Sequence, residues 1–353
     1  MKARNPKKKT DVALPASLDC LVVGGGSFGT ALATLLARNR KKVKLWVRRE
    51  EQAQEINRQH TNKSYFPDLK LPPNLEATTD LAEAVPRAPV VLVAVPTKGF
   101  REVARQVGDY LSGEQVLIHS TKGIEPGTYL RMSEVLREET CALKVGVVSG
   151  PSLAEELMAG HPTGASVASH YDEVVRKTQA LFAGSPLRLY AGHDLIGTEI
   201  GGAFKNIIAL MSGTAQGLGF GANTKALIVT RGLYEMTLYG SALGGDPMTF
   251  TGLAGIGDLI ATCSSTLSRN FRTGMRFAQG ESLDEILSSS SQVVEGVPAT
   301  KVVHQQSIQL GLDLPMVRAV YGAFFEGKKV HELLHQLMER PPGRETVRSR
   351  GVA

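Results

Sequence analysis

The chain has 353 residues, of which 42% are hydrophobic and 21% are charged, with 37 glycines and 17 prolines. This length fits two domains of about 150 residues each, and this composition excludes a disordered or fibrous protein. The net charge of +6 lies in the ends, because residues 1–10 carry +5 and residues 340–353 carry +3, which leaves −2 for the body. A nucleic-acid-binding surface should lie on a folded face, so we expect no nucleic-acid partner and interpret 1–17 and 340–353 as disordered basic tails.

Cysteine, histidine and apolar patterning exclude three further classes of protein. Cys20, Cys141 and Cys263 are too few and too widely spaced for a disulfide framework, and the eight scattered histidines show no metal-ligand spacing, so we expect no metal. No apolar run reaches the ~18 residues of a membrane span, and no apolar signal segment follows the lysine-rich start. We therefore expect a cytoplasmic enzyme without an integral membrane segment.

From residue 18 to residue 194, short β-branched runs alternate with amphipathic stretches of helical period, which is typical of repeated βαβ units. The runs are apolar throughout rather than alternating, which predicts a parallel sheet covered by helices on both faces. The fold class is therefore α/β, with an N-terminal doubly wound parallel sheet of the Rossmann type. We expect its strands at 20–23, 43–47, 90–95, 115–119, 145–148, 165–168 and 187–190.

Residues 195–339 lack this rhythm. Their apolar residues recur at helical spacing, as in Ile207, Ile208, Leu210 and Met211, with glycine and proline breaks between the runs. The sequence therefore predicts two domains, a sheet-containing domain over 18–194 and an all-helical domain over 195–339, and the motifs below indicate that the first binds NAD(P) and the second binds the substrate.

The first expected strand continues directly into residues 24–29, GGGSFG, a G-x-G-x-x-G pattern that precedes a helix. Gly24 permits a tight turn, Gly26 allows a pyrophosphate to approach the backbone, and Gly29 allows the helix to pack on the strand. The free N–H groups at the helix N-terminus favour phosphates. This context predicts a dinucleotide site, the alternative being a glycine-rich loop without a ligand.

The second expected strand ends at Arg48 and Arg49, which are followed by Glu50. A strict NAD site would place an acidic residue on the ribose 2′-hydroxyl, whereas paired guanidinium groups suit a 2′-phosphate. The pattern favours NADP(H) over NAD(H). Arg48 and Arg49 could also be solvated surface charges, and Glu50 keeps NAD(H) possible.

Four polar clusters interrupt otherwise apolar or glycine-rich surroundings, and each is a weak signal by itself. Two of them follow expected strands, at the sheet edge where ligands of open α/β folds bind. In chain order the clusters are Ser120-Thr121-Lys122-Gly123, Ser149-Gly150-Pro151-Ser152, the single Lys205 within GAFKNIIA, and Asp258 with the downstream triplet Ser268-Arg269-Asn270.

Lys205 is a candidate for proton transfer because it is surrounded by apolar helical neighbours. Burial of an ammonium is costly unless the group is paired, and it lowers the pKa from ~10.4 toward a working range. The alternative is a lysine that extends its charged end to water. Asp258 could anchor a lysine and the Ser-Arg-Asn triplet suits a phosphate, although helix capping by Asp258 and Ser268 would explain these residues equally well.

Taken together and in order, these segments resemble bacterial-type NAD(P)-dependent sn-glycerol-3-phosphate dehydrogenases. The resemblance runs from about Leu18 to Met338 through GGGSFGTALA, VAVPTKGF, HSTKGIEPGT, SGPSLAEEL, GAFKNIIAL, GLAGIGDLIATC, LSRN and VVEGVPATKVV. It implies reversible reduction of dihydroxyacetone phosphate to sn-glycerol 3-phosphate for glycerophospholipid synthesis. It also implies a homodimer and a helical C-terminal domain like that of 6-phosphogluconate dehydrogenase.

The resemblance also implies roles for residues at matching positions. Lys205 would accept and return the proton, Lys122 would polarise the carbonyl, and Asp258 would orient the two lysines. These three residues would contact substrate together with Gly150, Ser152, Ser268, Arg269 and Asn270. The cofactor would contact Gly24, Gly26, Ser27, Phe28, Gly29, Arg48, Arg49, Tyr65, Lys122, Ala154, Arg269, Val293 and Glu295.

Two other functions remain open at this point. A dehydrogenase of the same architecture could act on another hydroxy acid or sugar acid, although the Ser-Arg-Asn triplet favours a small phosphorylated substrate. A catalytically silent NADP-binding sensor is the second alternative. Lys205, Lys122 and Asp258 together argue against it, because a binding module needs no proton donor.

Overall fold

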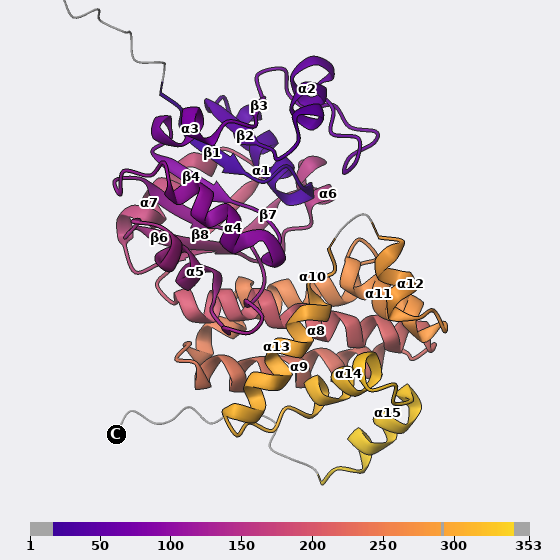
Figure 1. The fold of residues 1–353 in the computed structure, drawn as a ribbon. Coiled ribbons are helices and arrows are strands. Elements are labelled where there is room, and N and C mark those ends of the chain that lie inside the picture. The colour runs from indigo at the N-terminus through magenta and orange to yellow at the C-terminus, as the bar shows by residue number, and fades with distance from the viewer. Residues whose placement is uncertain (1–16, 291–292, 342–353) are drawn as a thin grey trace, which may run out of the picture.

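The computed structural model describes residues 17–290 and 293–341, so the expected basic tails fall almost entirely outside the described residues. A sheet-containing part comes first in the chain and a helical part follows it (Figure 1). The eight strands form one sheet in the order β3-β2-β1-β4-β5-β6-β7-β8. They are β1 (Cys20–Val23), β2 (Val43–Trp46), β3 (Glu76–Thr78), β4 (Val90–Val93), β5 (Val116–His119), β6 (Val145–Ser149), β7 (Thr163–Ser169) and β8 (Leu187–Gly192).

The sheet confirms the predicted α/β class and differs from the prediction at two strands. β3 was not predicted, because three residues that include the exposed Glu76 do not form an apolar run. β7 pairs antiparallel with β6, whereas every other pair of neighbours is parallel. Only the five-residue helix α6 (Ala154–Met158) separates β6 from β7, and antiparallel neighbours do not need a long crossover. The sheet is therefore mixed rather than wholly parallel.

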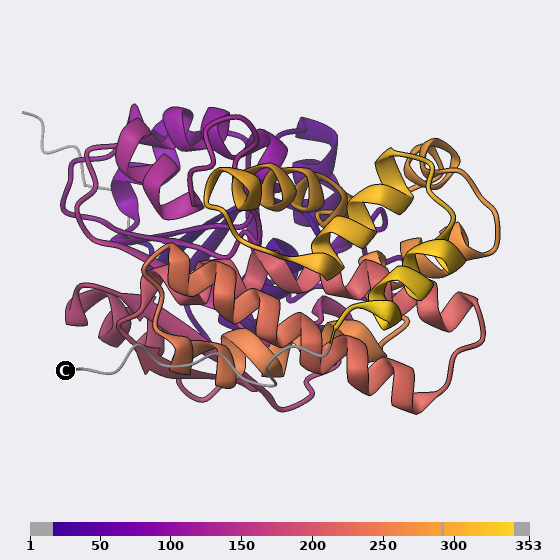
Figure 2. The same ribbon diagram turned by 90° about the horizontal axis from the view of Figure 1, so that it is seen from below.

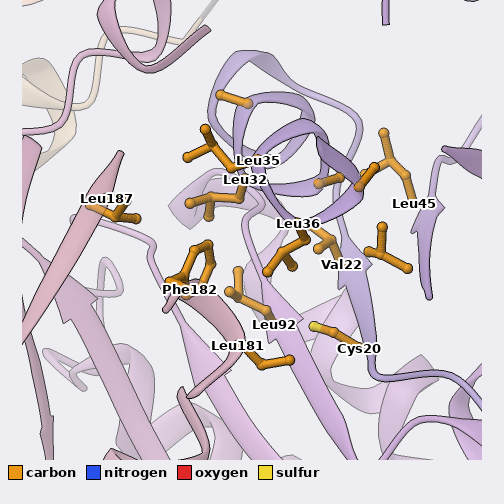
Figure 3. Close-up of a cluster of buried hydrophobic side chains, with 14 of the residues drawn as sticks. Cys20, Val22, Leu32, Leu35, Leu36, Leu45, Leu92, Leu181, Phe182 and Leu187 are labelled. Atoms are coloured by element: carbon orange, nitrogen blue, oxygen red, sulfur yellow. The ribbon is translucent and has the colours of Figure 1, made fainter. Parts of the chain in front are cut away.

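Helices cover both faces of this sheet, and the strands β1, β2, β4, β5 and β6 contribute buried side chains to both faces. Val22 packs under Leu32 and Leu36 of α1 (Ser27–Arg38), as Figure 3 shows, whereas its neighbour Leu21 belongs to the opposite cluster with Phe100. Burial on both faces explains why the strands are apolar throughout. The first face carries α1, α2 (Glu50–Gln59), α6 and α7 (Asp172–Phe182); the second carries α3 (Leu81–Ala84), α4 (Thr97–Gly108) and α5 (Met132–Glu139).

The helical part is built around α8 (Leu195–Gly217), whose residues from Gly197 to Ala215 are all buried. The side chain of Asp194 caps α8 by accepting a hydrogen bond from the N–H of Gly197 (2.8 Å). Most of the remaining helices pack directly against it, and the others extend the helical part (Figure 2). They are α9 (Ala222–Ala242), α10 (Asp258–Ser264), α11 (Arg269–Ala278), α12 (Leu283–Ser288), α13 (Gly296–Gln309), α14 (Pro315–Phe325) and α15 (Val330–Glu339).

Candidate active site

A cavity of about 920 Å³ lies between the two parts, lined by residues of both. On the sheet side its walls follow the carboxyl ends of β1, β4 and β5, the edge at which open α/β folds bind ligands. On the helical side it is lined by residues of α8, α10 and α11 and by the segment before α13. A cavity of this size can hold a dinucleotide together with a small substrate.

The glycine-rich turn after β1 has the geometry that a pyrophosphate requires. Gly24 has φ +124°, a conformation that L side chains rarely adopt, and a Cβ at Gly29 would lie 1.9 Å from the carbonyl oxygen of Gly24. A Cβ at Gly26 would meet nothing within 4 Å, so this glycine leaves open space on the cavity side. Gly26 also caps α1 without a side-chain hydrogen bond. The turn therefore fits the predicted dinucleotide site.

Shortly after the end of β2, which lies beside this turn, the exposed Arg48 and Arg49 line the cavity together with Tyr65. The carboxylate of Glu50 is engaged elsewhere, because it accepts a hydrogen bond from the Thr79 hydroxyl (2.9 Å). Glu50 is not among the cavity-lining residues. Two guanidinium groups therefore border this end of the cavity, and the neighbouring acid does not.

Two lysines share one carboxylate near the floor of the cavity. Lys205 Nζ lies 2.5 Å from Asp258 Oδ1, and Lys122 Nζ lies 2.6 Å from Asp258 Oδ2. Lys122 also donates to the carbonyl of Gly150 (2.9 Å), and Lys205 donates to the hydroxyl of Thr262 (2.7 Å). Asp258 and Lys205 are buried. Charged groups of opposite sign thus meet where little water can screen them.

Burial lowers the pKa of Lys205 to about 7, and the positive charge of Lys122 acts in the same direction. The carboxylate of Asp258 opposes this shift because it favours the charged ammonium. Lys205 does not extend its amine to bulk water, so the alternative of a solvated lysine is wrong. A lysine with this pKa can both donate and accept a proton near neutral pH.

The position of Asp258 depends on a close backbone contact. A π-helical turn, Leu253–Gly257, precedes α10, and Asp258 is the first residue of that helix. A Cβ at Gly201 of α8 would lie 2.4 Å from the carbonyl oxygen of Ala254, so only glycine allows this turn to lie against α8. Gly201 and Lys205 are four residues apart and share one helix face. The contact therefore brings Asp258 to Lys205.

The Ser-Arg-Asn triplet has a structural role in two of its three members. Ser268 caps α11, since its hydroxyl accepts a hydrogen bond from the N–H of Phe271 (3.3 Å). Asn270 is buried, and its amide oxygen accepts a hydrogen bond from the N–H of Gly296 (2.9 Å). The capping interpretation is thus correct for Ser268, although both side chains also line the cavity.

Arg269 lies at the rim of the cavity, where its Nη1 donates to the carbonyl of Val293 (2.7 Å). Glu295, two residues further along this segment, accepts a hydrogen bond from the backbone N–H of Thr97 (3.0 Å). Thr97 is the first residue of α4, so this bond joins the helical part to the sheet part beside the cavity.

The structure brings most of the predicted site residues to one cavity. Three predicted residues are not among those that line it: Gly29, Gly150 and Asp258. The predicted residues that line it are Gly24, Gly26, Ser27, Phe28, Arg48, Arg49, Tyr65, Lys122, Ser152, Ala154, Lys205, Ser268, Arg269, Asn270, Val293 and Glu295.

The sequence analysis missed Asn206 and Thr262, which also line the cavity. The Asn206 amide oxygen accepts a hydrogen bond from Asn270 Nδ2 (2.8 Å). Thr262 lies four residues after Asp258 in α10, and this spacing could have revealed it, because residues four apart share a helix face.

The described part of the chain, 17–290 with 293–341, contains no group of three or more His, Cys, Asp or Glu side chains that could hold a metal ion. Within the same residues, no helix is long and apolar enough to cross a membrane.

Comparisons with known proteins agree with this geometry. Residues 19–175 match the family model of the NAD-dependent glycerol-3-phosphate dehydrogenase N-terminus, and residues 194–335 match that of its C-terminus. A glycerol-3-phosphate dehydrogenase [NAD(P)+] of Staphylococcus aureus is 47% identical over 322 residues, which cover 90% of this chain and 97% of the relative.

Two solved structures are similar along the same length. The Coxiella burnetii glycerol-3-phosphate dehydrogenase superposes with a TM-score of 0.88 at 33% identity, covering 92% of this chain and 99% of that one. The Saccharomyces cerevisiae glycerol-3-phosphate dehydrogenase has a TM-score of 0.80 at 28% identity, covering 92% and 100%. The chain belongs to the NAD-dependent glycerol-3-phosphate dehydrogenase family.

Proposed function

We propose that this protein catalyses the reversible, NAD(P)-dependent reduction of dihydroxyacetone phosphate to sn-glycerol 3-phosphate. The observation that carries the proposal is the carboxylate of Asp258, shared by Lys122 and Lys205 at a cavity large enough for a dinucleotide. The relatives are named for this activity and match nearly the whole chain.

When bound, the nicotinamide ring supplies or accepts the hydride. Lys205 gives its proton to the oxygen of the substrate carbonyl during reduction and takes it back during oxidation. Its pKa of about 7 suits both directions. Lys122 polarises the carbonyl, and Asp258 fixes the direction of both ammonium groups.

Ser268, Arg269 and Asn270 bind the substrate, chiefly through its phosphate, and Gly150 and Ser152 contribute from the sheet part. The guanidinium of Arg269 supports this role, because its position at the rim suits a charge-assisted hydrogen bond to a phosphate. The negative substrate would also lie near Lys122 and Lys205, two positive groups that share the single carboxylate of Asp258 among the described residues.

The cofactor is NAD or NADP, as the family implies. Its pyrophosphate would lie on the turn of Gly24 to Gly29. Other parts of the cofactor would contact further residues that line the cavity. These are Ser27, Phe28, Tyr65, Lys122, Ala154, Arg269, Val293 and Glu295. We propose that NADP(H) is preferred, because Arg48 and Arg49 border the cavity while Glu50 is bonded to Thr79.

We further propose the domain limits 18–194 and 195–339, a homodimeric assembly, a cytoplasmic location and a supply of product for glycerophospholipid synthesis. The change from β8 to α8 at Asp194 supports the first of these limits. Sedimentation of the purified full chain would test the dimer.

The proposed reaction is tested by absorbance at 340 nm with dihydroxyacetone phosphate and either NADPH or NADH. We expect both cofactors to be oxidised with dihydroxyacetone phosphate, and at low cofactor concentration NADPH should be oxidised faster than NADH. Unphosphorylated dihydroxyacetone at the same concentration should cause no oxidation. Cofactor binding without oxidation would reject this substrate. It would favour another dehydrogenase activity or a silent sensor.

A further inference from the structure

A second buried carboxylate, Glu199, lies near the start of α8, outside the cavity. Its oxygens accept hydrogen bonds from Arg131 Nη1 (2.6 Å), from the N–H of Ser133 (2.8 Å) and from the hydroxyl of Ser133 (2.7 Å). His119 Nε2 lies 3.0 Å from Glu199 Oε1. These partners belong to the end of β5 and the start of α5, so Glu199 ties the central helix to the sheet.

Two observations connect the Glu199 contacts to the lysine pair. His119 is the last residue of β5 and comes three residues before Lys122. Along α8, Glu199 shares a helix face with Gly202 and with Asn206, because the three positions are spaced i, i+3 and i+7.

The same face of α8 touches Lys122 directly. A Cβ at Gly202 would lie 3.3 Å from Lys122 Cγ, so the lysine stem passes close over the helix. Asn206 Nδ2 donates to the carbonyl of Lys122 (3.4 Å). The face that Glu199 fixes to β5 is therefore the face along which Lys122 reaches Asp258.

Glu199 keeps its charge despite its burial. Burial by itself raises the pKa of Glu199, but its close contacts with His119, Arg131 and Ser133 outweigh this effect and hold the pKa at about 2. Removal of this carboxylate would leave the N–H and the hydroxyl of Ser133 without their buried acceptor, and Arg131 would keep only Glu134 and the Ser133 hydroxyl as partners within the described chain. A local rearrangement at the contact between β5 and α8 is then expected, because unpaired buried polar groups are costly.

We propose that Glu199 is a positioning residue, which holds α8 in register with the end of β5 so that Lys122 and Lys205 can share Asp258. The expected effect of Glu199 on turnover rests on the proposed function, whereas its expected effect on the positions of Lys122 and Lys205 does not.

The test compares two isosteric substitutions of buried carboxylates. Glu199→Gln keeps the size of the side chain but loses its charge and one acceptor oxygen. Glu235→Gln is the matched control, since Glu235 is also buried in the helical part and accepts backbone N–H bonds from Met316 (2.7 Å) and Val317 (3.1 Å). The structure records no contact of Glu235 with Lys122, Lys205 or Asp258 among the described residues.

We expect Glu199→Gln to lower kcat for dihydroxyacetone phosphate by about 100-fold, the typical effect of a misplacement near 1 Å. KM and the NADPH dissociation constant should stay within about two-fold, because the groups that line the cavity are retained. Glu235→Gln should keep all three values near wild type. A kcat for Glu199→Gln equal to that of the control would overturn the proposal.

A second readout does not need turnover. The pH dependence of acylation of the Lys205 amine, followed by mass spectrometry, reports the pKa of this lysine in the full chain. Glu199→Gln should move that pKa upward from about 7 by roughly half a unit or more, because a loosened contact admits water and burial is the main cause of the low value. The control should not move it.

The two proposals fail in distinguishable ways. If wild-type protein does not reduce dihydroxyacetone phosphate, the proposed function fails, and the acylation profile still tests the positioning role. If Glu199→Gln does not fold, Glu199→Asp keeps the charge on a shorter side chain and should show the same changes to a smaller degree. Wild-type kcat and a wild-type acylation profile in a folded Glu199 variant would reject the positioning role.

Discussion

The two sides of the cavity are built from different chemical groups. On the sheet side, the turn of Gly24 to Gly29 offers backbone and open space, with an uncapped helix N-terminus behind it. On the helical side, the chemistry depends on the buried side chains of Lys205 and Asp258. Lys122 belongs to the sheet side but reaches across to the helical side, where it meets Asp258.

This difference decides what each side tolerates. A site made of backbone groups requires glycines that leave space for the ligand. An added methyl group at such a glycine therefore harms binding, whereas most substitutions of neighbouring side chains do not. A cluster of buried charges depends on every partner, because the loss of one leaves another unpaired in a medium that solvates it poorly. Substitutions on the two sides should therefore fail in different ways.

The largest effect is expected on the helical side. Lys205→Met removes the proton donor but keeps an apolar stem of similar length, so kcat in both directions should fall by about 1,000-fold. NADPH affinity, measured by fluorescence titration, should change little because the glycine-rich turn is intact. Turnover near the wild-type rate would remove Lys205 from the mechanism.

On the sheet side, substitutions of two glycines should separate the effect on stability from the effect on cofactor binding. Gly29→Ala would place a Cβ 1.9 Å from the Gly24 carbonyl oxygen, so the turn must deform, and both the melting temperature and cofactor binding should fall. Gly26→Ala has no clash within 4 Å and should melt like wild type. Its NADPH affinity should nevertheless drop by about ten-fold or more, because the methyl group occupies the approach of the pyrophosphate. Equal melting temperatures for the two variants would contradict this separation.

The charge cluster also predicts a pH dependence. The pKa of Lys205 is about 7, and the donor in reduction is the protonated amine, so reduction should be fastest below pH 7 and decline above it. Oxidation needs the neutral amine and should rise through the same range. Asp258→Asn removes the carboxylate that favours the ammonium, so both profiles should move to lower pH by about one unit. Initial rates between pH 5.5 and 9 test this at saturating substrate; a move to higher pH would show that Asp258 does not act on Lys205 in this way.

The smallest effect concerns the adenine end of the cavity. Replacement of Arg48 and Arg49 by glutamine should weaken NADPH binding by about ten-fold and leave NADH binding nearly unchanged, because only NADPH carries the 2′-phosphate. Glu50→Gln is the control, and it should change neither affinity, since Glu50 is bonded to Thr79 outside the cavity. Equal losses for the two cofactors in the arginine variant would mean that these residues do not recognise the 2′-phosphate.

Local patterns predicted much of the fold, and the misses have physical reasons. The apolar strands and the turn after β1 were predictable, because both follow from short stretches of neighbouring residues. The strand Glu76–Thr78 was missed since pairing with β2 forms it, not a run of apolar side chains. The antiparallel direction of β7 was also missed, because strand direction depends on the path of the chain between strands.

In the candidate site too, single residues could be predicted from local sequence, whereas the contacts between them could not. Lys205 and Asp258 could be selected from the sequence as a buried lysine and a possible anchor, but no local pattern joins them. Their meeting depends on the close contact of Gly201 with the carbonyl of Ala254. The spacing of Thr262 from Asp258 could have marked it as a neighbour of that carboxylate, but its contact with Lys205 exists only after α10 packs on α8.

The sequence by itself determined the class of fold, the glycine-rich turn and the polar residues available to a phosphorylated substrate, because these depend on periodicity and on neighbours along the chain. Only the tertiary structure decided that Lys122 and Lys205 share Asp258, that Glu50 turns away from the cavity, and that Glu199 joins α8 to β5. The contacts of Asp258 and of Glu199 join residues more than 50 positions apart, and burial then acts on the pKa values of Lys205 and Glu199, so neither these contacts nor the pKa values are visible before the chain has folded.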